Sequence, residues 1–209
     1  MTDRLDNFTD AAFAFAVSLL VIGGARAPED FDALLSALGD IPAFAFGFAV
    51  MAMFWFSHVR WRAERGDGDG LSVLLTLLLV FLTLVYVQPL RAMAAATGLW
   101  FTGQGAGFGG SLTGLFAVYG TGFVAMSLTM AMLWSETLRG GHLNIAGKSN
   151  AKGERGIFLI MALTGIASIL ISTTRFGMLA AMVYATLPIT IGVFVWRHNW
   201  TGQAEAVSE

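Results

Sequence analysis

Residues 71–90 read LSVLLTLLLVFLTLVYVQPL and contain no charged side chain. At about 1.5 Å per residue, a helix over this stretch is ~30 Å long, which matches the hydrocarbon thickness of a bilayer. Lipid offers no partners to backbone N–H and C=O groups, so a spanning segment must bond them internally. The stretch therefore predicts a transmembrane helix. Applied along the chain, the same criterion predicts spans at 8–25, 41–57, 71–90, 111–134, 156–174 and 176–196.

The composition agrees with lipid as the main solvent of the chain. Of 209 residues, 56% are hydrophobic and 12% are charged, and the mean hydropathy is +0.70. Soluble domains carry about a quarter charged residues. We therefore expect an all-α polytopic membrane protein with six transmembrane helices and one repeat per chain. Its six-helix unit covers residues 1–197, a polar and mobile C-terminal tail covers 198–209, and 31–39 form a short surface helix.

Several functional classes are excluded by residue types that are absent or scattered. There is no cysteine, which excludes disulfides, thiolate catalysis and cysteine-rich metal sites. The formal charge of −2 and basic residues confined to short loops give no reason to expect nucleic acid as a partner. The three histidines show no metal-ligand spacing. We expect neither a cofactor nor a fixed metal ion.

The distribution of Lys and Arg predicts the orientation, because these residues accumulate on cytoplasmic loops. A cytoplasmic N-terminus and C-terminus place nine of them inside and three outside. Most tryptophans then fall at inner helix ends, where their amphipathic rings suit the headgroup layer. The expected location is the cell membrane. The inner basic residues are Arg4, Arg60, Arg62, Arg65, Arg139, Lys148, Lys152, Arg155 and Arg197, and the outer ones are Arg26, Arg91 and Arg175.

An alternative for the first apolar segment is a signal peptide, since residues 25–27 (Ala-Arg-Ala) loosely resemble a cleavage site. The region before it carries Asp3, Asp6 and Asp10 against Arg4, which is the wrong charge for export. We expect the segment to be retained as a helix.

The first span carries the strongest chemical signal, a carboxylate at Asp10 near its start. Ionisable groups in a span are costly and mark functional sites, although Asp10 can equally stabilise the first helical turn in the interface. Further along, one stripe at helical spacing contains a single hydroxyl group; its members are Phe15, Ser18, Leu19 and Ile22. Such a stripe fits a packing surface, a lipid-facing surface or a pore lining.

Two blocks resemble the transmembrane protein 175 family of potassium channels, in particular its short prokaryotic members. The first is Arg4, three residues, then Phe8-Thr9-Asp10 and an apolar run, where the family has Ser in place of Thr9. The second, at 54–60, reads FWFSHVR and is followed by Asp69. Here the family has a second His at Val59 and Asn at Thr76.

The resemblance implies a potassium-permeable channel subunit that assembles as a homotetramer in the lipid bilayer around the first helices. Its pore-facing positions would be Phe15, Ser18, Leu19 and Ile22, forming an apolar constriction crossed by transiently bound potassium. A hydrogen-bonded network holding the pore helices would comprise Arg4, Phe8, Thr9, Asp10, His58 and Thr76. The family usually has Ile or Leu where Phe15 stands, and four phenyl rings would narrow the path.

Two other membrane functions stay open, an ion-coupled transporter and a non-conducting assembly protein. A transporter usually needs intramembrane charges or broken helices in paired repeats. An intramembrane serine hydrolase would need facing Ser and His side chains, but Ser111 and His198 are predicted in opposite leaflets. We therefore do not expect an enzyme.

Overall fold

The computed structural model describes residues 2–22, 29–39, 41–66, 68–101, 112–140, 143–175 and 177–207, and these are almost entirely helical. The elements are α1 (Thr2–Ile22), α2 (Phe31–Gly39), α3 (Ile41–Arg65), α4 (Gly70–Phe101), α5 (Leu112–Arg139), α6 (Ile145–Ser172), the 3-10 turn η1 (Gly177–Leu179), α7 (Ala180–Ala185) and α8 (Leu187–Val207).

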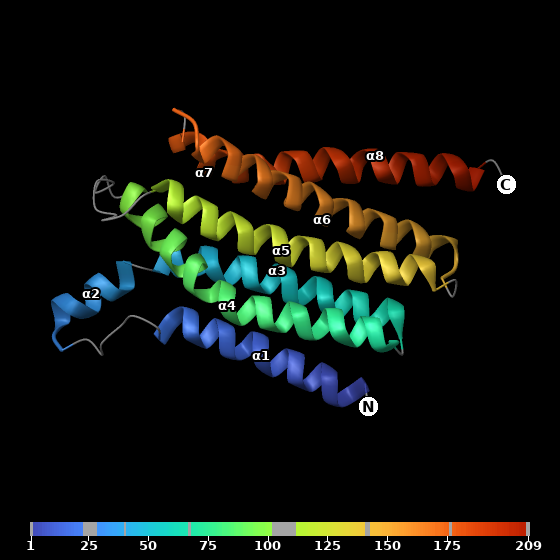
Figure 1. The fold of residues 1–209 in the computed structure, drawn as a ribbon, viewed down its shortest axis with the longest axis horizontal. Coiled ribbons are helices and arrows are strands. Elements are labelled where there is room, and N and C mark those ends of the chain that lie inside the picture. Colours follow the sequence, from blue (N-terminus) through green and yellow to red (C-terminus); the bar gives the residue numbers. More distant parts are fainter. Residues whose placement is uncertain are drawn as a thin grey trace.

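The long helices run back and forth along one axis of the molecule (Figure 1). The start of α1 and the end of α8 lie at the same end of the bundle, together with the basic end of α3. Helix α2 lies near the opposite end, between α1 and α3 in sequence. This is the all-α polytopic membrane fold that the hydropathy pattern predicts.

Among the described residues, five helices are long and apolar enough to span a membrane: α3, α4, α5, α6 and Ala180–His198. The first predicted span, 8–25, is described only as far as Ile22, and its helix α1 begins in the charged segment before residue 8. The short helix predicted at 31–39 is α2. It exposes apolar side chains, including Phe31 at 70% exposure.

Helices α1 and α8 lie at opposite edges of the bundle: α1 contacts α3 and α4, and α8 packs against α6. The centre is filled by large aromatic side chains from α3 to α6. The aromatic side chains buried to less than 2% exposure are Trp61, Trp134, Tyr86, Tyr119, Phe54 and Phe158. Many apolar side chains on the outer surface are exposed, as expected for a protein whose surroundings are lipid.

Several helix boundaries differ from the sequence-based prediction, and the differences with structural causes are in α6 and in the last span. Helix α6 begins at Ile145 instead of residue 156, because the side chain of Asn144 caps it by accepting from the Gly147 N–H at 2.8 Å. The last span is broken into η1, α7 and α8, with the second break at Thr186 immediately before α8. Helix α8 then continues to Val207, through most of the segment expected to be a polar tail.

Glycine allows the edge helix α8 to approach α6 closely. A Cβ atom added at Gly156 would overlap the Phe194 ring, so a larger residue fits there only if that ring moves. Close approach at small residues is the usual way in which helices associate in lipid, where the hydrophobic effect does not drive them together.

Candidate functional site

Helix α1 has two faces, of which one is buried against α3 and α4. The buried face includes Thr9, Phe13 and Ala16, each at most 3% exposed. The opposite face is open in the single chain. Its exposed positions follow helical spacing, and they include Arg4, Phe8, Ala11, Phe15 and Ser18.

The predicted pore stripe falls mainly at the open face of α1. Phe15 is 57% exposed, and Ser18 is also exposed and donates its hydroxyl to the Ala14 carbonyl oxygen at 2.9 Å. Leu19 is half-buried and packs against the core, so it lies at the margin of this face. The side chain of Ile22 lies outside the described part of the structure. The pore-facing role of these four residues stays a prediction.

Asp10 makes a defined contact between helices. The indole Nε1–H of Trp55 on α3 donates to Asp10 Oδ1 at 2.8 Å. Hydrogen bonds to a charged acceptor are shorter and stronger than neutral ones. The sequence places Trp55 only in the headgroup layer, and nothing in the motif spacing assigns it to Asp10.

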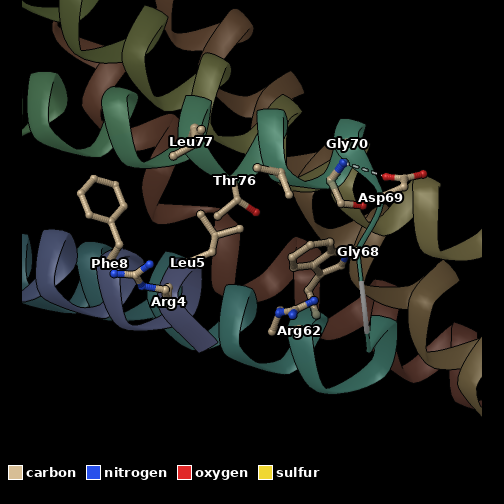
Figure 2. Close-up of a pocket in the computed structure, with 12 residues that line it drawn as sticks. Arg4, Leu5, Phe8, Arg62, Gly68, Asp69, Gly70, Thr76 and Leu77 are labelled. Atoms are coloured by element: carbon tan, nitrogen blue, oxygen red, sulfur yellow. Dashed lines mark hydrogen bonds between the residues drawn. The ribbon is translucent and has the colours of Figure 1, made fainter. Parts of the chain in front are cut away.

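The other motif residues divide between contacts within the bundle and positions on its surface. His58 Nε2 lies 3.3 Å from Thr76 Oγ1, which links α3 to α4. The buried Thr9 hydroxyl donates to the Leu5 carbonyl oxygen of its own helix at 2.9 Å. Arg4 and Phe8 line a pocket between α1, α3 and α4 (Figure 2). Arg4 makes no polar contact within the described residues, so its place in the network stays a prediction.

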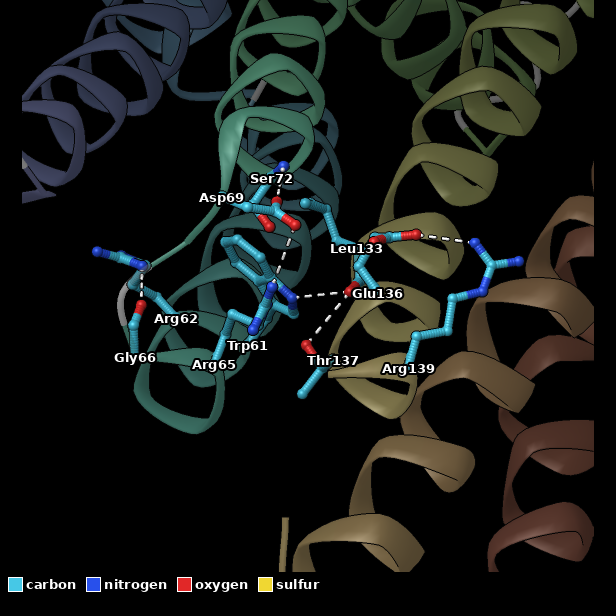
Figure 3. Close-up of polar contacts among 10 residues, drawn as sticks. All are labelled: Trp61, Arg62, Arg65, Gly66, Asp69, Ser72, Leu133, Glu136, Thr137 and Arg139. Atoms are coloured by element: carbon cyan, nitrogen blue, oxygen red, sulfur yellow. Dashed lines mark hydrogen bonds and ion pairs between the residues drawn. The ribbon is translucent and has the colours of Figure 1, made fainter. Parts of the chain in front are cut away.

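Further polar contacts connect helices at the basic end of the bundle. Arg62 Nε donates to Asp6 Oδ1 at 2.8 Å, which is a second link between α1 and α3. Trp61 Nε1–H donates to the Leu133 carbonyl oxygen at 2.9 Å and ties α3 to α5 (Figure 3). The backbone N–H of Ser72 donates to Asp69 at 2.9 Å and holds the pKa of that carboxyl below its usual value. Asp69 is therefore ionised and caps α4.

Sequence reasoning misses an ion pair that joins α3 to α6 and in which the carboxylate is buried and the guanidinium is partly exposed. Arg60 Nη1 lies 2.6 Å from Glu154 Oε1, and Glu154 is only 8% exposed. The Ser57 hydroxyl donates to Glu154 Oε2 at 3.4 Å. Nearby, Asn150 accepts from Arg60 Nη2 at 3.2 Å and donates to Glu64 Oε1 at 3.0 Å. Glu154, like Asp10, is therefore a carboxylate that links two helices.

No group of three His, Asp or Glu side chains in the described ranges is placed to hold a metal ion. His58 contacts the Thr76 hydroxyl and the Trp61 ring. The centroids of the His58 and Trp61 rings lie 5.2 Å apart. These contacts support packing and positioning of helices.

Replacing Trp55 by Phe is expected to destabilise the protein by about 1–2 kcal/mol, because Asp10 loses a donor to a charged acceptor. The readout is thermal unfolding of purified protein in detergent. Trp196→Phe is the matched control, since Trp196 on α8 is 65% exposed. Equal melting temperatures for the two variants would show that the Asp10 contact has no energetic weight.

The fold and the contacts of Asp10 and Asp6 define a helical membrane protein in which one face of α1 is bound to α3 and α4 and the opposite face is exposed in the single chain. A family model described as endosomal/lysosomal potassium channel TMEM175 matches residues 4–87. A relative from Marivirga tractuosa named potassium channel is 36% identical over 91 residues, which cover 44% of this chain and 36% of the relative.

Two solved structures share the architecture over nearly the whole chain. A variant of the potassium channel MtTMEM175, crystallised with a nanobody fusion protein, superposes with a TM-score of 0.80 at 25% identity, covering 94% of this chain and 93% of that one. A lysosomal potassium-selective channel TMEM175 homolog from Chamaesiphon minutus superposes with a TM-score of 0.59 at 21% identity, covering 95% and 98%, and it supports the fold alone. These matches show that the first part of the chain, residues 4–87, is similar to the TMEM175 potassium-channel family and that the chain shares the fold of solved channels with that name.

Proposed function

We propose that this chain is the subunit of a potassium-permeable channel in which copies of α1 surround a common axis. The observation that carries the proposal is the asymmetry of α1. One face of α1 is buried against α3 and α4, whereas Phe15 and Ser18 are exposed on its opposite face. Four copies arranged as a homotetramer would place these positions along one path, as closed symmetric assemblies do.

The proposed path is controlled by an apolar constriction. Rings of Phe15 and Leu19 would exclude water when narrow, and conduction would depend on whether the constriction is wetted. Ser18 donates its proton to the backbone, so its oxygen lone pairs are free to face a partly dehydrated cation. Ile22 would complete the apolar stripe. Selectivity from such a path is expected to be modest.

The links from α1 to the rest of the subunit would set its tilt. Trp55 holds Asp10 and Arg62 holds Asp6, so two charge-assisted hydrogen bonds join α1 to α3 on the same end of the bundle. His58 and Thr76 join α3 to α4 behind them. A helix fixed in this way can present the same side chains to the axis in each subunit.

The proposed setting is the cell membrane, with both termini in the cytoplasm. The start of α1 and the end of α8 lie at one end, and that end also carries the basic segment Arg60 to Arg65. Basic residues near helix ends favour the cytoplasmic side.

The direct test is potassium flux into liposomes that contain the purified protein. Wild-type protein is expected to pass potassium faster than empty liposomes when only a potassium gradient is applied. Flux that requires a proton or sodium gradient would instead indicate an ion-coupled transporter. A tetramer with no flux under either condition would indicate a non-conducting assembly protein.

A further inference from the structure

A pocket of about 700 Å³ opens between α1, α3 and α4 at the basic end of the bundle (Figure 2). Arg4 and Phe8 belong both to its wall and to the open face of α1, so the pocket lies beside the proposed ion path at its basic end. Its wall combines two cations, one carboxylate, hydroxyl groups and apolar side chains, and it includes Arg4, Trp61, Arg62, Asp69, Thr76 and Leu77.

The charge of this pocket is unbalanced. Arg62 is paired with Asp6 and also donates to the Gly66 carbonyl oxygen. Asp69 is paired with Arg65 at 3.5 Å and caps α4. Arg4 has no ion pair or hydrogen bond with any residue that the structure describes. The pocket therefore presents one uncompensated guanidinium group, which suits a phosphate because its fork of N–H donors matches phosphate oxygens.

The apolar part of the pocket extends along α4 away from the charged end. Val73 and Leu77 line it at successive turns and are 38% and 42% exposed. Phe81, one turn further along α4, is 60% exposed. A free anion would gain nothing from this stripe. An acyl chain attached to the anion would cover it.

We propose that this pocket binds the phosphate headgroup of an anionic phospholipid, with an acyl chain along Val73, Leu77 and Phe81. Arg4 would bind the phosphate, and the neighbouring Arg62 would add positive potential at the other end of the pocket. Basic pockets between transmembrane helices at the membrane surface are suited to anionic headgroups. The proposal can be tested separately from ion conduction, because the experiment measures lipid binding directly.

The test is native mass spectrometry of delipidated protein titrated with phosphatidylglycerol or with phosphatidylcholine. Wild-type protein is expected to bind phosphatidylglycerol in preference, and Arg4→Gln is expected to weaken that binding about fivefold to tenfold. Arg139→Gln is the matched control, because Arg139 lies at the same end of the bundle, is 78% exposed and pairs with Glu136 away from the pocket.

A second variant tests the acyl stripe without changing charge. Leu77→Trp should crowd the pocket and weaken phosphatidylglycerol binding while Arg4 is intact. Equal binding of the two lipids, or equal phosphatidylglycerol binding by wild type and Arg4→Gln, would overturn the proposal. Displacement of the lipid by an equal concentration of inorganic phosphate would overturn it in favour of a free anion. A wild-type protein that binds no lipid would also overturn it.

Discussion

Replacing Arg60 by Met is expected to lower the free energy of unfolding by about 2–3 kcal/mol, the largest stability change among single substitutions considered for this protein. The variant leaves Glu154, which is 8% exposed, without the cation that lies 2.6 Å away. A buried carboxylate without a partner is costly because desolvation is no longer offset. The Arg60 side chain is 41% exposed, so we place the value below that of a fully buried pair. Thermal unfolding in detergent measures it.

The control separates burial from the mere presence of an ion pair. Arg139 pairs with Glu136 at 2.9 Å, but its side chain is 78% exposed. Exposed pairs contribute about 0–1 kcal/mol, so Arg139→Met should barely change the melting temperature. Adding Glu154→Gln to Arg60→Met should restore part of the loss, since a neutral amide is less costly to bury. Similar melting temperatures for Arg60→Met and Arg139→Met would contradict the assignment.

The spans could be predicted from the sequence because hydropathy reports the part of a helix that lies in lipid. It does not report where the helix ends in water. Helix α3 continues to Arg65 and α4 to Phe101, whereas the apolar stretches suggest 57 and 90. Charged residues at these ends are compatible with a helix once they leave the bilayer, so the pattern cannot distinguish a loop from a helical extension.

Helix α6 also begins outside its apolar stretch, so the sequence predicts a loop at Glu154 and not a helical residue facing α3. Glycines and charges before residue 156 favour a loop on composition alone. In the structure, Asn150 and Glu154 lie four residues apart on one helix face. Arg60 and Glu64 have the same spacing on α3, and the two faces meet. The matching spacings are a usable signal, but only after both segments are known to be helical.

The contacts of Asp10 illustrate what a motif leaves undetermined. The motif marks Asp10 as unusual, yet its partner depends on how α3 is rotated about its own axis. Trp55, His58 and Arg62 point in directions set by packing of the whole bundle, and only His58 belongs to the predicted network. Periodicity nevertheless predicts the grouping of Phe15 and Ser18, because both lie at the open face of α1.

Replacing Phe15 by Ala is expected to raise potassium flux into liposomes about tenfold, which corresponds to a barrier lower by ~1.4 kcal/mol. The phenyl ring is 57% exposed in the subunit and would project toward the proposed axis. Four such rings would narrow an apolar constriction, and smaller side chains would widen and wet it. The rate of flux per reconstituted protein is the measurement, with Phe15→Trp expected to change it in the opposite direction.

Phe48→Ala is the matched control, because Phe48 is 47% exposed but belongs to α3. Its flux should equal that of wild type. If wild type conducts and the flux of Phe15→Ala and of Phe15→Trp equals that of wild type, the ion path does not pass Phe15 on the open face of α1. If both Phe→Ala variants raise flux equally, the effect comes from loosened helix packing and not from the constriction. A response confined to Phe15, with opposite signs for the smaller and larger side chain, requires that ring to lie in the path.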